Sequence, residues 1–428
     1  PKPEARSPKP ASDSADVAVV GAGAAGLATA IFAARAAHGL RVVVLDGARK
    51  IGAKILVSGG SRCNVTNRVV TERDFWGGSP RLIAHVLRAF PAGRTARFFE
   101  ELGVALHEEE DGKLFPDSNS SRTVLDALLA EAARRDVTIE SGARVVAIRH
   151  EAGGFAIERA GAPALRARAV VLATGGRSLP KSGSDGFGYQ LAAAFGHGCV
   201  ATTPALAPLV LRGSAHAELS GVSLPAALTL RDGGKTLVRL EGALLWTHFG
   251  ASGPVVLNLS RHWHRAVLGG AAVNVHVGVL PGETFESIER WLLDEAAARP
   301  RAQVVTLLGQ RLPNAVAVAW VAMAGVPRDA TMAHLTRDDR RRLAHDLHET
   351  PLHVEDSRGY AYAEVTAGGV PLDEIDTATM ESRKQPGLYL VGEILDVDGR
   401  LGGFNFQWAW SSGWVAGHAL ARARAEAR

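Results

Sequence analysis

Short apolar runs alternate with helix-length stretches over the first 200 residues of the chain. Residues 17–20 form an apolar run, residues 27–37 are rich in alanine, and residues 41–45 form a second apolar run that ends at Asp46. This order predicts a strand, a helix and a parallel strand, which together make a βαβ unit. Further helices are predicted over 79–103, 121–135 and 184–195, and further strands over 137–140, 143–150, 155–159 and 169–173.

The pattern changes near residue 199 and changes back near residue 351. Strand-length apolar segments separated by turn residues are followed by a long region with helical periodicity over 285–345. The α/β pattern then returns, with a strand at 387–391 and an alanine-rich helix at 407–425. We therefore predict one discontinuous nucleotide-binding domain, interrupted by a β-rich insert and a helical insert.

Composition narrows the class of protein. The 428 residues are 46% hydrophobic and 21% charged, which is typical of a globular chain, and the net charge is +4 without a dense basic stripe. We therefore expect no nucleic acid partner. Two cysteines without a CxxC pair favour a reducing compartment. Residues 1–15 lack the apolar core of a signal peptide, and the longest apolar stretch, 315–326, is too short to span a membrane. We expect a cytoplasmic protein that does not enter the membrane.

A glycine motif follows the first predicted strand. Gly21, Gly23 and Gly26 form G-x-G-x-x-G, with Ala24 and Ala25 between them. Such a turn permits a tight strand-to-helix connection and lets a pyrophosphate approach the free N–H groups of the helix. Asp46 ends the next strand, where a carboxylate can accept hydrogen bonds from ribose hydroxyls. The spacing predicts a dinucleotide site, and a plain turn with incidental glycines is the alternative.

The segment Lys54–Asn67 reads as a polar, glycine-rich loop placed to wrap a cofactor. Its donors could meet phosphate groups and the edge of a flavin, whereas an ordinary surface loop is the alternative. The residues predicted to contact the cofactor here are Lys54, Ser58, Gly59, Gly60, Arg62, Asn64 and Asn67.

Ordered blocks of residues carry a resemblance to a known family. The blocks are residues 17–26, 52–67, 173–180, 246–254, 363–370 and 386–413, the last containing Gly402-Gly-Phe-Asn-Phe-Gln407. With them the chain resembles the BaiN-like, or aminoacetone oxidase-like, family of FAD flavoproteins, which is related to glutathione reductase. Ser61 departs from the family pattern, which has a third glycine there, and Phe404 stands where tyrosine is usual.

The resemblance implies an α/β fold, with a Rossmann-like FAD-binding domain carrying a β-rich and a helical insert. We expect a disordered tail at 1–15, the first part of the FAD-binding domain at 16–198, the β-rich insert at 199–280, the helical insert at 281–350 and the second part at 351–428. It also implies that Val145, Ala173, Thr174, Gly175 and Gly176 lie near FAD.

A second glycine-rich segment lies near the C-terminus. It follows the last predicted strand, and the helix after it could direct its N–H groups at the pyrimidine end of a flavin, where reduction places negative charge. Acidic side chains in the segment could bind ribityl hydroxyls. A glycine-rich helix cap beside an unrelated acidic loop is the alternative. The predicted residues are Gly392, Glu393, Asp396, Gly402, Gly403, Phe404 and Asn405.

We expect an FAD-dependent oxidoreductase that passes hydride through flavin N5. The donor would be NAD(P)H or an organic compound, and the acceptor a small organic substrate. No second G-x-G-x-x-G marks a separate NAD(P)H domain, so NAD(P)H would bind transiently. His248 and Thr247 are the candidate catalytic residues, with a structural histidine as the alternative. Cys63 is expected to be structural, and no metal site is expected. An amine oxidase that uses O2 and an FAD-dependent RNA-modifying enzyme are the alternative functions. The oligomeric state stays open.

Overall fold

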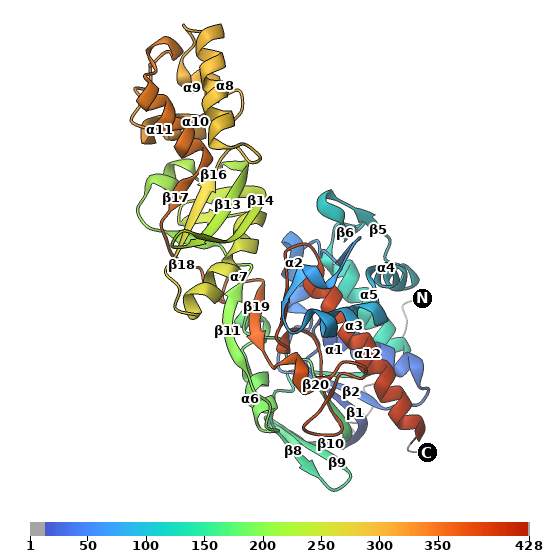
Figure 1. The fold of residues 1–428 in the computed structure, drawn as a ribbon. Helices are drawn as coiled ribbons and strands as arrows, with labels where there is room; N and C mark the ends of the chain where they lie inside the picture. Colours follow the sequence, from blue (N-terminus) through green and yellow to red (C-terminus); the bar gives the residue numbers. More distant parts are fainter. Residues whose placement is uncertain (1–12, 427–428) are drawn as a thin grey trace. The chain divides into compact units, whose positions relative to one another are not determined.

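The computed structural model describes residues 13–426, which divide into two compact units (Figure 1). Unit 1 comprises the residues up to Thr202 and from Val365 onward, and unit 2 comprises Thr203–Glu364. Most of the tail expected at residues 1–15 lies outside the described residues. Ser14 and Ala15 are not part of a tail, however, because they begin β1 (Ser14–Val20) and pair with Arg166 and Ala167.

Unit 1 is built on a mixed sheet whose central strands are parallel. Their order is β22-β10-β1-β2-β7, so the strands of the predicted βαβ unit, β1 and β2 (Val42–Asp46), lie side by side, and Val19 pairs with Val44. This is the predicted Rossmann-like α/β fold. The other strands of this sheet are β7 (Thr138–Ser141), β8 (Val145–Glu151), β9 (Gly154–Arg159), β10 (Ala162–Leu172), β20 (Ile375–Asp376), β21 (Glu381–Ser382) and β22 (Leu388–Leu390).

Two long helices pack together in unit 1. Helix α1 (Ala24–Ala36) follows β1, and α12 (Phe404–Glu426) ends the described chain. A Cβ atom at Gly413 of α12 would lie 2.9 Å from Ala28 Cβ and 3.0 Å from Ala25 O, so the two helices touch backbone to backbone. The remaining helices are α2 (Ala53–Ser61), α3 (Pro80–Ala89), α4 (Ala92–Glu101), α5 (Ser121–Arg134) and α6 (Phe187–Ala193). Smaller strands are β3 (Thr66–Asn67), β4 (Phe75–Gly77), β5 (Leu106–Glu108), β6 (Lys113–Pro116) and β23 (Val397–Gly399).

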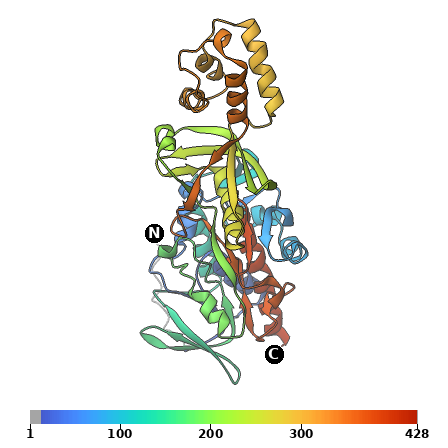
Figure 2. The same ribbon diagram turned by 60° about the vertical axis from the view of Figure 1, so that its left-hand side comes forward.

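Unit 2 combines an antiparallel sheet with a helical group. The sheet has the order β17-β16-β13-β14-β15-β12-β18. Helix α7 (Pro254–Leu268) packs against β13 and β14 of this sheet. Its strands are β12 (Leu209–Leu211), β13 (Ser223–Asp232), β14 (Lys235–Thr247), β15 (Gly250–Ser252), β16 (Val273–Gly278), β17 (Thr350–Leu352) and β18 (Val354–Ser357). Figures 1 and 2 show helices α8 to α11 grouped at one end of this sheet. They are α8 (Phe285–Ala298), α9 (Val304–Leu308), α10 (Asn314–Met323) and α11 (Arg337–His348).

The inserted region ends later than the sequence suggested. We expected the FAD-binding domain to resume at residue 351, but β17 pairs with β16 and β18 pairs with β12, so both strands belong to unit 2. The chain leaves unit 1 along β11 (Val200–Ala205) and returns along β19 (Val365–Gly369), and these two strands pair with each other. Strand pairing across distant segments sets this boundary, and local sequence patterns do not reveal it.

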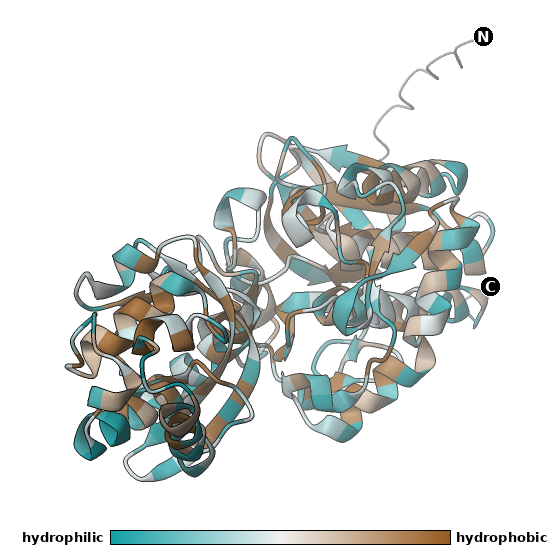
Figure 3. Cartoon of the chain, turned by 90° about the horizontal axis from the view of Figure 1, so that it is seen from above, coloured by the Kyte–Doolittle hydropathy of each residue, from teal (hydrophilic) through white to brown (hydrophobic). Residues whose placement is uncertain are grey.

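Each unit has its own hydrophobic core. One core cluster is formed within unit 1 and includes Ile31, Val44 and Trp408, while the other, in unit 2, includes Leu228 and Trp320. Figure 3 shows hydrophobic positions concentrated on the strands of unit 1 and on the helices of unit 2. Within the part of the chain that the structure describes, none of the helices has the length and apolar character needed to cross a membrane.

Candidate functional site

The turn between β1 and α1 has room only for glycine at two of its positions. Gly21 has φ +106°, and a Cβ atom there would lie 2.3 Å from Ala173 O. A Cβ at Gly26 would lie 1.9 Å from Gly21 O. Ala173, which follows β10, therefore packs directly under the turn, and the predicted residues of these two segments meet.

The N-terminus of α1 is open to an anion. Gly23 is its N-cap, no side chain caps it, and its first turn contains no acidic residue. Apart from its chain neighbours and the backbone of the helix, no residue within 13–426 has an atom within 4 Å of the place that a Cβ of Gly23 would occupy. A helix start with free N–H groups and clear space suits the pyrophosphate of FAD, and Ala24 and Ala25 add no bulk there.

Asp46 is held in place by backbone amides. Its Oδ2 accepts from Ala22 N at 2.7 Å and its Oδ1 accepts from Ala48 N at 2.7 Å. The carboxylate is half-buried at the end of β2, next to the glycine turn. A carboxylate oxygen can accept more than one hydrogen bond, so a ribose hydroxyl fits this group without displacing either amide.

The segment Lys54–Asn67 is not the continuous loop that its composition suggested. Residues from Ala53 to Val57 are helical within α2, and the backbone leaves the helix only at Ser58, with left-handed φ at Gly59, Gly60 and Ser61. The apolar positions of its first half explain the difference, because Ile55 is buried in the unit 1 core. Lys54 therefore projects from a helix.

Lys54 joins a polar network from four distant segments of unit 1. Its Nζ donates to Ser178 Oγ at 2.7 Å and to Glu393 Oε2. Ser178 Oγ donates to Glu393 Oε1 at 2.8 Å, and Thr366 N donates to the same oxygen at 3.0 Å. A Cβ at Gly176 would lie 2.4 Å from Thr366 Oγ1, so Thr366 packs closely on the segment that follows β10. Ser178 and Thr366 were not predicted, although both lie in the sequence blocks that resemble the family.

The side chains of Arg62, Asn64 and Asn67 contact other parts of the protein. The Arg62 guanidinium pairs with Glu109 and stacks over Phe115 at 4.2 Å from the ring centre. With the Asn64 amide oriented so that both ends find partners, its oxygen accepts from Gly403 N at 3.1 Å. Asn67 Nδ2 donates to Gly402 O at 3.2 Å. The two asparagines thus tie this segment to the C-terminal glycines.

The C-terminal segment meets the first glycine turn. A Cβ at Gly392 would lie 2.7 Å from Ala25 Cβ, which brings the two predicted halves of the cradle together. The side chain of Phe404 is fully buried, and Asn405 exchanges two hydrogen bonds with the backbone of Gly399. Asp396 is buried too. Contacts of Phe404 and Asn405 with a cofactor would therefore use the backbone and not the side chains.

The other predicted residues are distributed over both units. Val145 is buried in β8, and Thr174 packs so closely on Gly188 that a Cβ there would lie 1.8 Å from its Oγ1. Thr247 and His248 belong to unit 2, where His248 is exposed and Thr247 Oγ1 is enclosed without a partner among the described residues. Their catalytic role stays a prediction.

Cys63 is enclosed in unit 1. Its side chain is fully buried, and burial raises the pKa of its thiol to about 12, against a smaller lowering by Ser58. Cys199 is exposed, and the two thiols form no disulfide. This environment suits a packing role. Within residues 13–426, no cluster of His, Cys, Asp and Glu could hold a metal ion.

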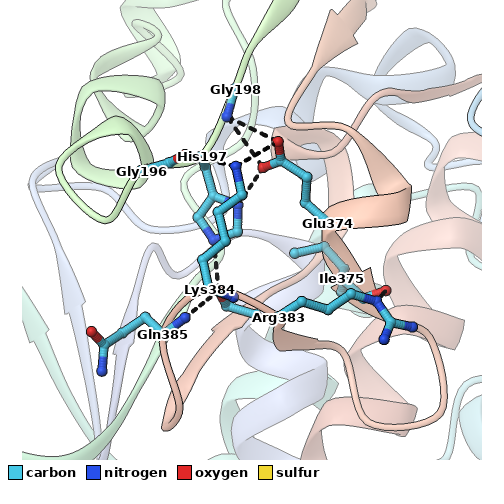
Figure 4. Close-up of polar contacts among 9 residues, drawn as sticks. Gly196, His197, Gly198, Glu374, Ile375, Arg383, Lys384 and Gln385 are labelled. Atoms are coloured by element: carbon cyan, nitrogen blue, oxygen red, sulfur yellow. Dashed lines mark hydrogen bonds and ion pairs between the residues drawn. The ribbon is translucent and has the colours of Figure 1, made fainter.

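A serine–histidine–glutamate arrangement in unit 1 was not predicted, and Figure 4 labels its histidine and its glutamate. His197 Nδ1 lies 2.7 Å from Glu374 Oε2, and its Nε2 lies 2.8 Å from Ser382 Oγ. The order matches that of a hydrolase, but Ser382 is buried and its Oγ already accepts from the amides of Lys384 and Gln385. With its lone pairs used, Ser382 cannot act as a nucleophile, so the arrangement anchors the chain after α6.

Comparisons with known proteins cover nearly the whole chain. A family model described as the HI0933-like protein Rossmann domain matches residues 15–419. The ribosomal RNA dihydrouridine synthase of Escherichia coli (strain K12) is 34% identical over 412 residues, covering 96% of this chain and 98% of that protein. The 3-dehydro-bile acid delta(4,6)-reductase of Clostridium scindens is 34% identical over 405 residues, covering 95% and 98%.

A solved structure agrees in fold. The 3-ketosteroid delta1-dehydrogenase of Sterolibacterium denitrificans has a TM-score of 0.51 at 14% identity, covering 96% of this chain and 100% of that one, which shows likeness of fold alone. The family match confirms the resemblance drawn from the sequence blocks. The open helix start of α1 and the positioned carboxylate of Asp46 fit the cofactor that the resemblance implied. The chain therefore belongs to the HI0933-like Rossmann-domain family and is an FAD-dependent oxidoreductase.

Proposed function

We propose that this flavoenzyme reduces a carbon–carbon double bond that is conjugated to a carbonyl group. The relatives from E. coli and C. scindens are named for different substrates. The two names imply related reactions. Dihydrouridine is uridine in which a double bond conjugated to a ring carbonyl is saturated. A delta(4,6)-reductase acts on double bonds conjugated to a 3-keto group. This shared bond chemistry, in relatives similar over almost the full chain, is the observation that carries the proposal.

Residues of unit 1 would hold the cofactor. The N–H groups at the start of α1 would bind the pyrophosphate, and Asp46 would accept from the adenosine ribose, where Ala22 N and Ala48 N already orient it. When bound, FAD supplies a two-electron carrier that can give a hydride to an electron-poor carbon. Gly392 packs on Ala25 so closely that a larger residue would disturb the same cradle.

Lys54 is the candidate for the residue that stabilises negative charge in this site. Two of its three N–H donors are directed at Ser178 and Glu393, which leaves one N–H for a cofactor or substrate oxygen. Reduction of a conjugated carbonyl compound builds negative charge on oxygen, and a positioned cation lowers the energy of that state. His248 remains the candidate for the proton donor in unit 2.

We propose NADH or NADPH as the electron donor. Within residues 13–426, unit 2 forms an antiparallel sheet with helices, and the described chain has one glycine-rich βαβ unit, in unit 1. A nicotinamide would therefore bind without a Rossmann domain of its own. Anaerobic mixing with each nucleotide tests this point, because reduction bleaches the flavin absorption band.

The substrate is tested with the reduced enzyme. Under anaerobic conditions it is mixed with a 3-keto-4,6-diene bile acid, with an unmodified RNA that contains uridine, or with an amine as a control. We expect one conjugated substrate to restore the flavin band and to gain two mass units. Failure of both, together with release of hydrogen peroxide when the oxidised enzyme meets amines in air, would replace the proposal with the amine oxidase alternative.

A further inference from the structure

An arginine in unit 2 is held between two aromatic rings. The guanidinium carbon of Arg358 lies 3.4 Å from the ring centre of Tyr362 and 4.6 Å from that of Phe249. Within residues 13–426, this guanidinium has no carboxylate within 4 Å and donates no hydrogen bond to another residue. Its charge is met by ring faces alone, and its N–H donors remain available to an anion.

The stack of Phe249, Arg358 and Tyr362 is partly open to solvent. The ring of His248 meets that of Phe249 edge to face, at a centroid distance of 5.1 Å and an interplanar angle of 84°, so it borders the stack without extending it. Tyr362 is 50% exposed, an unusual exposure for a large aromatic ring, and His248 is exposed as well. One ring face of Tyr362 meets Arg358, and the exposed half of this residue offers surface to a further planar group.

The backbone around Arg358 is fixed. Arg358 N donates to Pro208 O at 3.0 Å, and Ser357 Oγ accepts from Gly359 N at 3.0 Å. Ser357 Oγ also lies 2.7 Å from His264 Nε2 of α7. Strand β12 lies between β15 and β18, so the sheet itself sets the turn with Phe249 beside the segment with Arg358. The planar groups are thus positioned before any ligand binds.

We propose that Phe249, Arg358 and Tyr362 form the surface on which unit 2 binds a nucleotide of single-stranded RNA. The base would stack on the exposed surface of the Tyr362 ring, and the Arg358 guanidinium would donate to phosphate oxygens. Stacking on aromatic rings together with contacts from arginine is how proteins bind unpaired bases. A bile acid has a mostly saturated ring system with little flat π surface, so the stack favours a base. The inference rests on the proposed function in its uridine form.

The balanced charge of unit 2 predicts how RNA binding depends on salt. The unit carries 16 Lys and Arg and 16 Asp and Glu, so it has no net charge to attract RNA over a wide area. Binding would depend on the local stack and would change little with salt. Each phosphate contact on a single strand contributes about 0.7 to the slope of log affinity against log salt concentration.

Fluorescence anisotropy of the full-length enzyme with a fluorescein-labelled, uridine-containing RNA decamer tests the surface. We expect Tyr362→Ala and Arg358→Ala to raise the Kd about tenfold or more, and Tyr362→Phe to change it less than about twofold. Arg358→Ala should also lower the salt slope by about 0.7. Arg301→Ala, which removes an exposed arginine without a ring partner, is the matched charge control and should change the Kd less than about twofold. Flavin content and thermal melting verify that each variant is folded.

The outcomes separate this surface from the proposed reaction. RNA that binds through Tyr362 and Arg358 but is never reduced supports the surface and contradicts the uridine form of the reaction. If the decamer does not bind, or if it binds equally well to both alanine variants, the surface is wrong even when the enzyme reduces a conjugated bond. Displacement of the decamer by a 3-keto-4,6-diene bile acid at lower concentration than by uridine monophosphate would also overturn it.

Discussion

Ala25 and Gly392 lie against each other, although they come from opposite ends of the chain. A Cβ atom at Gly392, where φ is +74°, would lie 2.7 Å from Ala25 Cβ. The contact joins the start of α1 to the segment after β22. It is the point at which the two glycine-rich segments of the predicted cofactor cradle meet.

Gly392→Ala is expected to destabilise the protein and to weaken FAD binding. Left-handed φ costs an L-residue about 1–2 kcal/mol, and the contact with Ala25 adds to this cost. Gly39→Ala is the matched control, because Gly39 has φ +75° and, among the described residues beyond its chain neighbours, none lies within 4 Å of the added Cβ. The melting temperature should fall further for Gly392→Ala than for Gly39→Ala. Adding Ala25→Gly to the Gly392→Ala variant should recover part of the lost melting temperature. Equal melting of the two variants would contradict a tight contact.

Asp46→Ala is expected to raise the Kd for FAD about 10- to 100-fold. The change removes the predicted acceptor for the ribose and leaves the amides of Ala22 and Ala48 without their acceptor, and hydrogen bonds to charged groups contribute about 1.5–3 kcal/mol. Titration of flavin-free protein with FAD measures the effect. Asp46→Asn keeps one acceptor oxygen and should weaken binding less. An unchanged Kd in both variants would remove Asp46 from the site.

Ser61→Gly is expected to stabilise the protein by about 0.5–1 kcal/mol. Ser61 has φ +68°, the third left-handed residue in a row after Gly59 and Gly60, so glycine relieves strain, part of which is offset by its larger freedom in the unfolded chain. Ser61→Ala keeps the strain and serves as the control. A melting temperature of Ser61→Gly no higher than that of Ser61→Ala would count against this explanation.

Only one of the two cysteines should react in the folded protein. Burial raises the pKa of the Cys63 thiol to about 12 and shields it from reagents, whereas Cys199 is exposed, although partial burial and Asp396 also raise the pKa of its thiol. A thiol-specific disulfide reagent at pH 8 should label one thiol per chain in native protein and two after denaturation. Cys199→Ser should abolish native labelling. Rapid labelling of that variant would show that Cys63 is accessible.

Glu131 should make unit 1 sensitive to acid. Burial alone would raise its pKa, but hydrogen bonds from Arg135, Arg35 and Arg134 outweigh burial and lower the pKa from 4.5 to about 2. A lowered pKa in the folded state stabilises the protein above pH 4.5, and this contribution is lost as the pH falls from 4.5 toward 2. At about 1.4 kcal/mol per pKa unit, the contribution is about 3 kcal/mol.

Glu131→Gln tests this dependence. The variant should be less stable than the parent at pH 7 and should lose less additional stability between pH 4.5 and pH 3, measured by urea unfolding. Glu108→Gln removes a more exposed carboxylate that pairs with Arg68 and should leave the pH profile close to that of the parent. A Glu131→Gln profile parallel to that of the parent would refute the role of Glu131.

Local sequence determined the parts of this protein that depend on neighbouring residues. The turn at Gly21 and Gly26, the acid at the end of β2 and the parallel βαβ order all follow from spacing and apolar runs, because each is set within a few residues of the chain. The family blocks extended this to the cofactor and to the enzyme class.

Tertiary structure alone decided which distant groups meet. It paired Lys54 with Ser178 and Glu393, tied Asn64 and Asn67 to the C-terminal glycines, and assigned β17 and β18 to unit 2. It also set Arg358 between Phe249 and Tyr362. Such contacts depend on how the sheets and helices pack, and packing joins residues whose spacing along the chain carries no periodic signal.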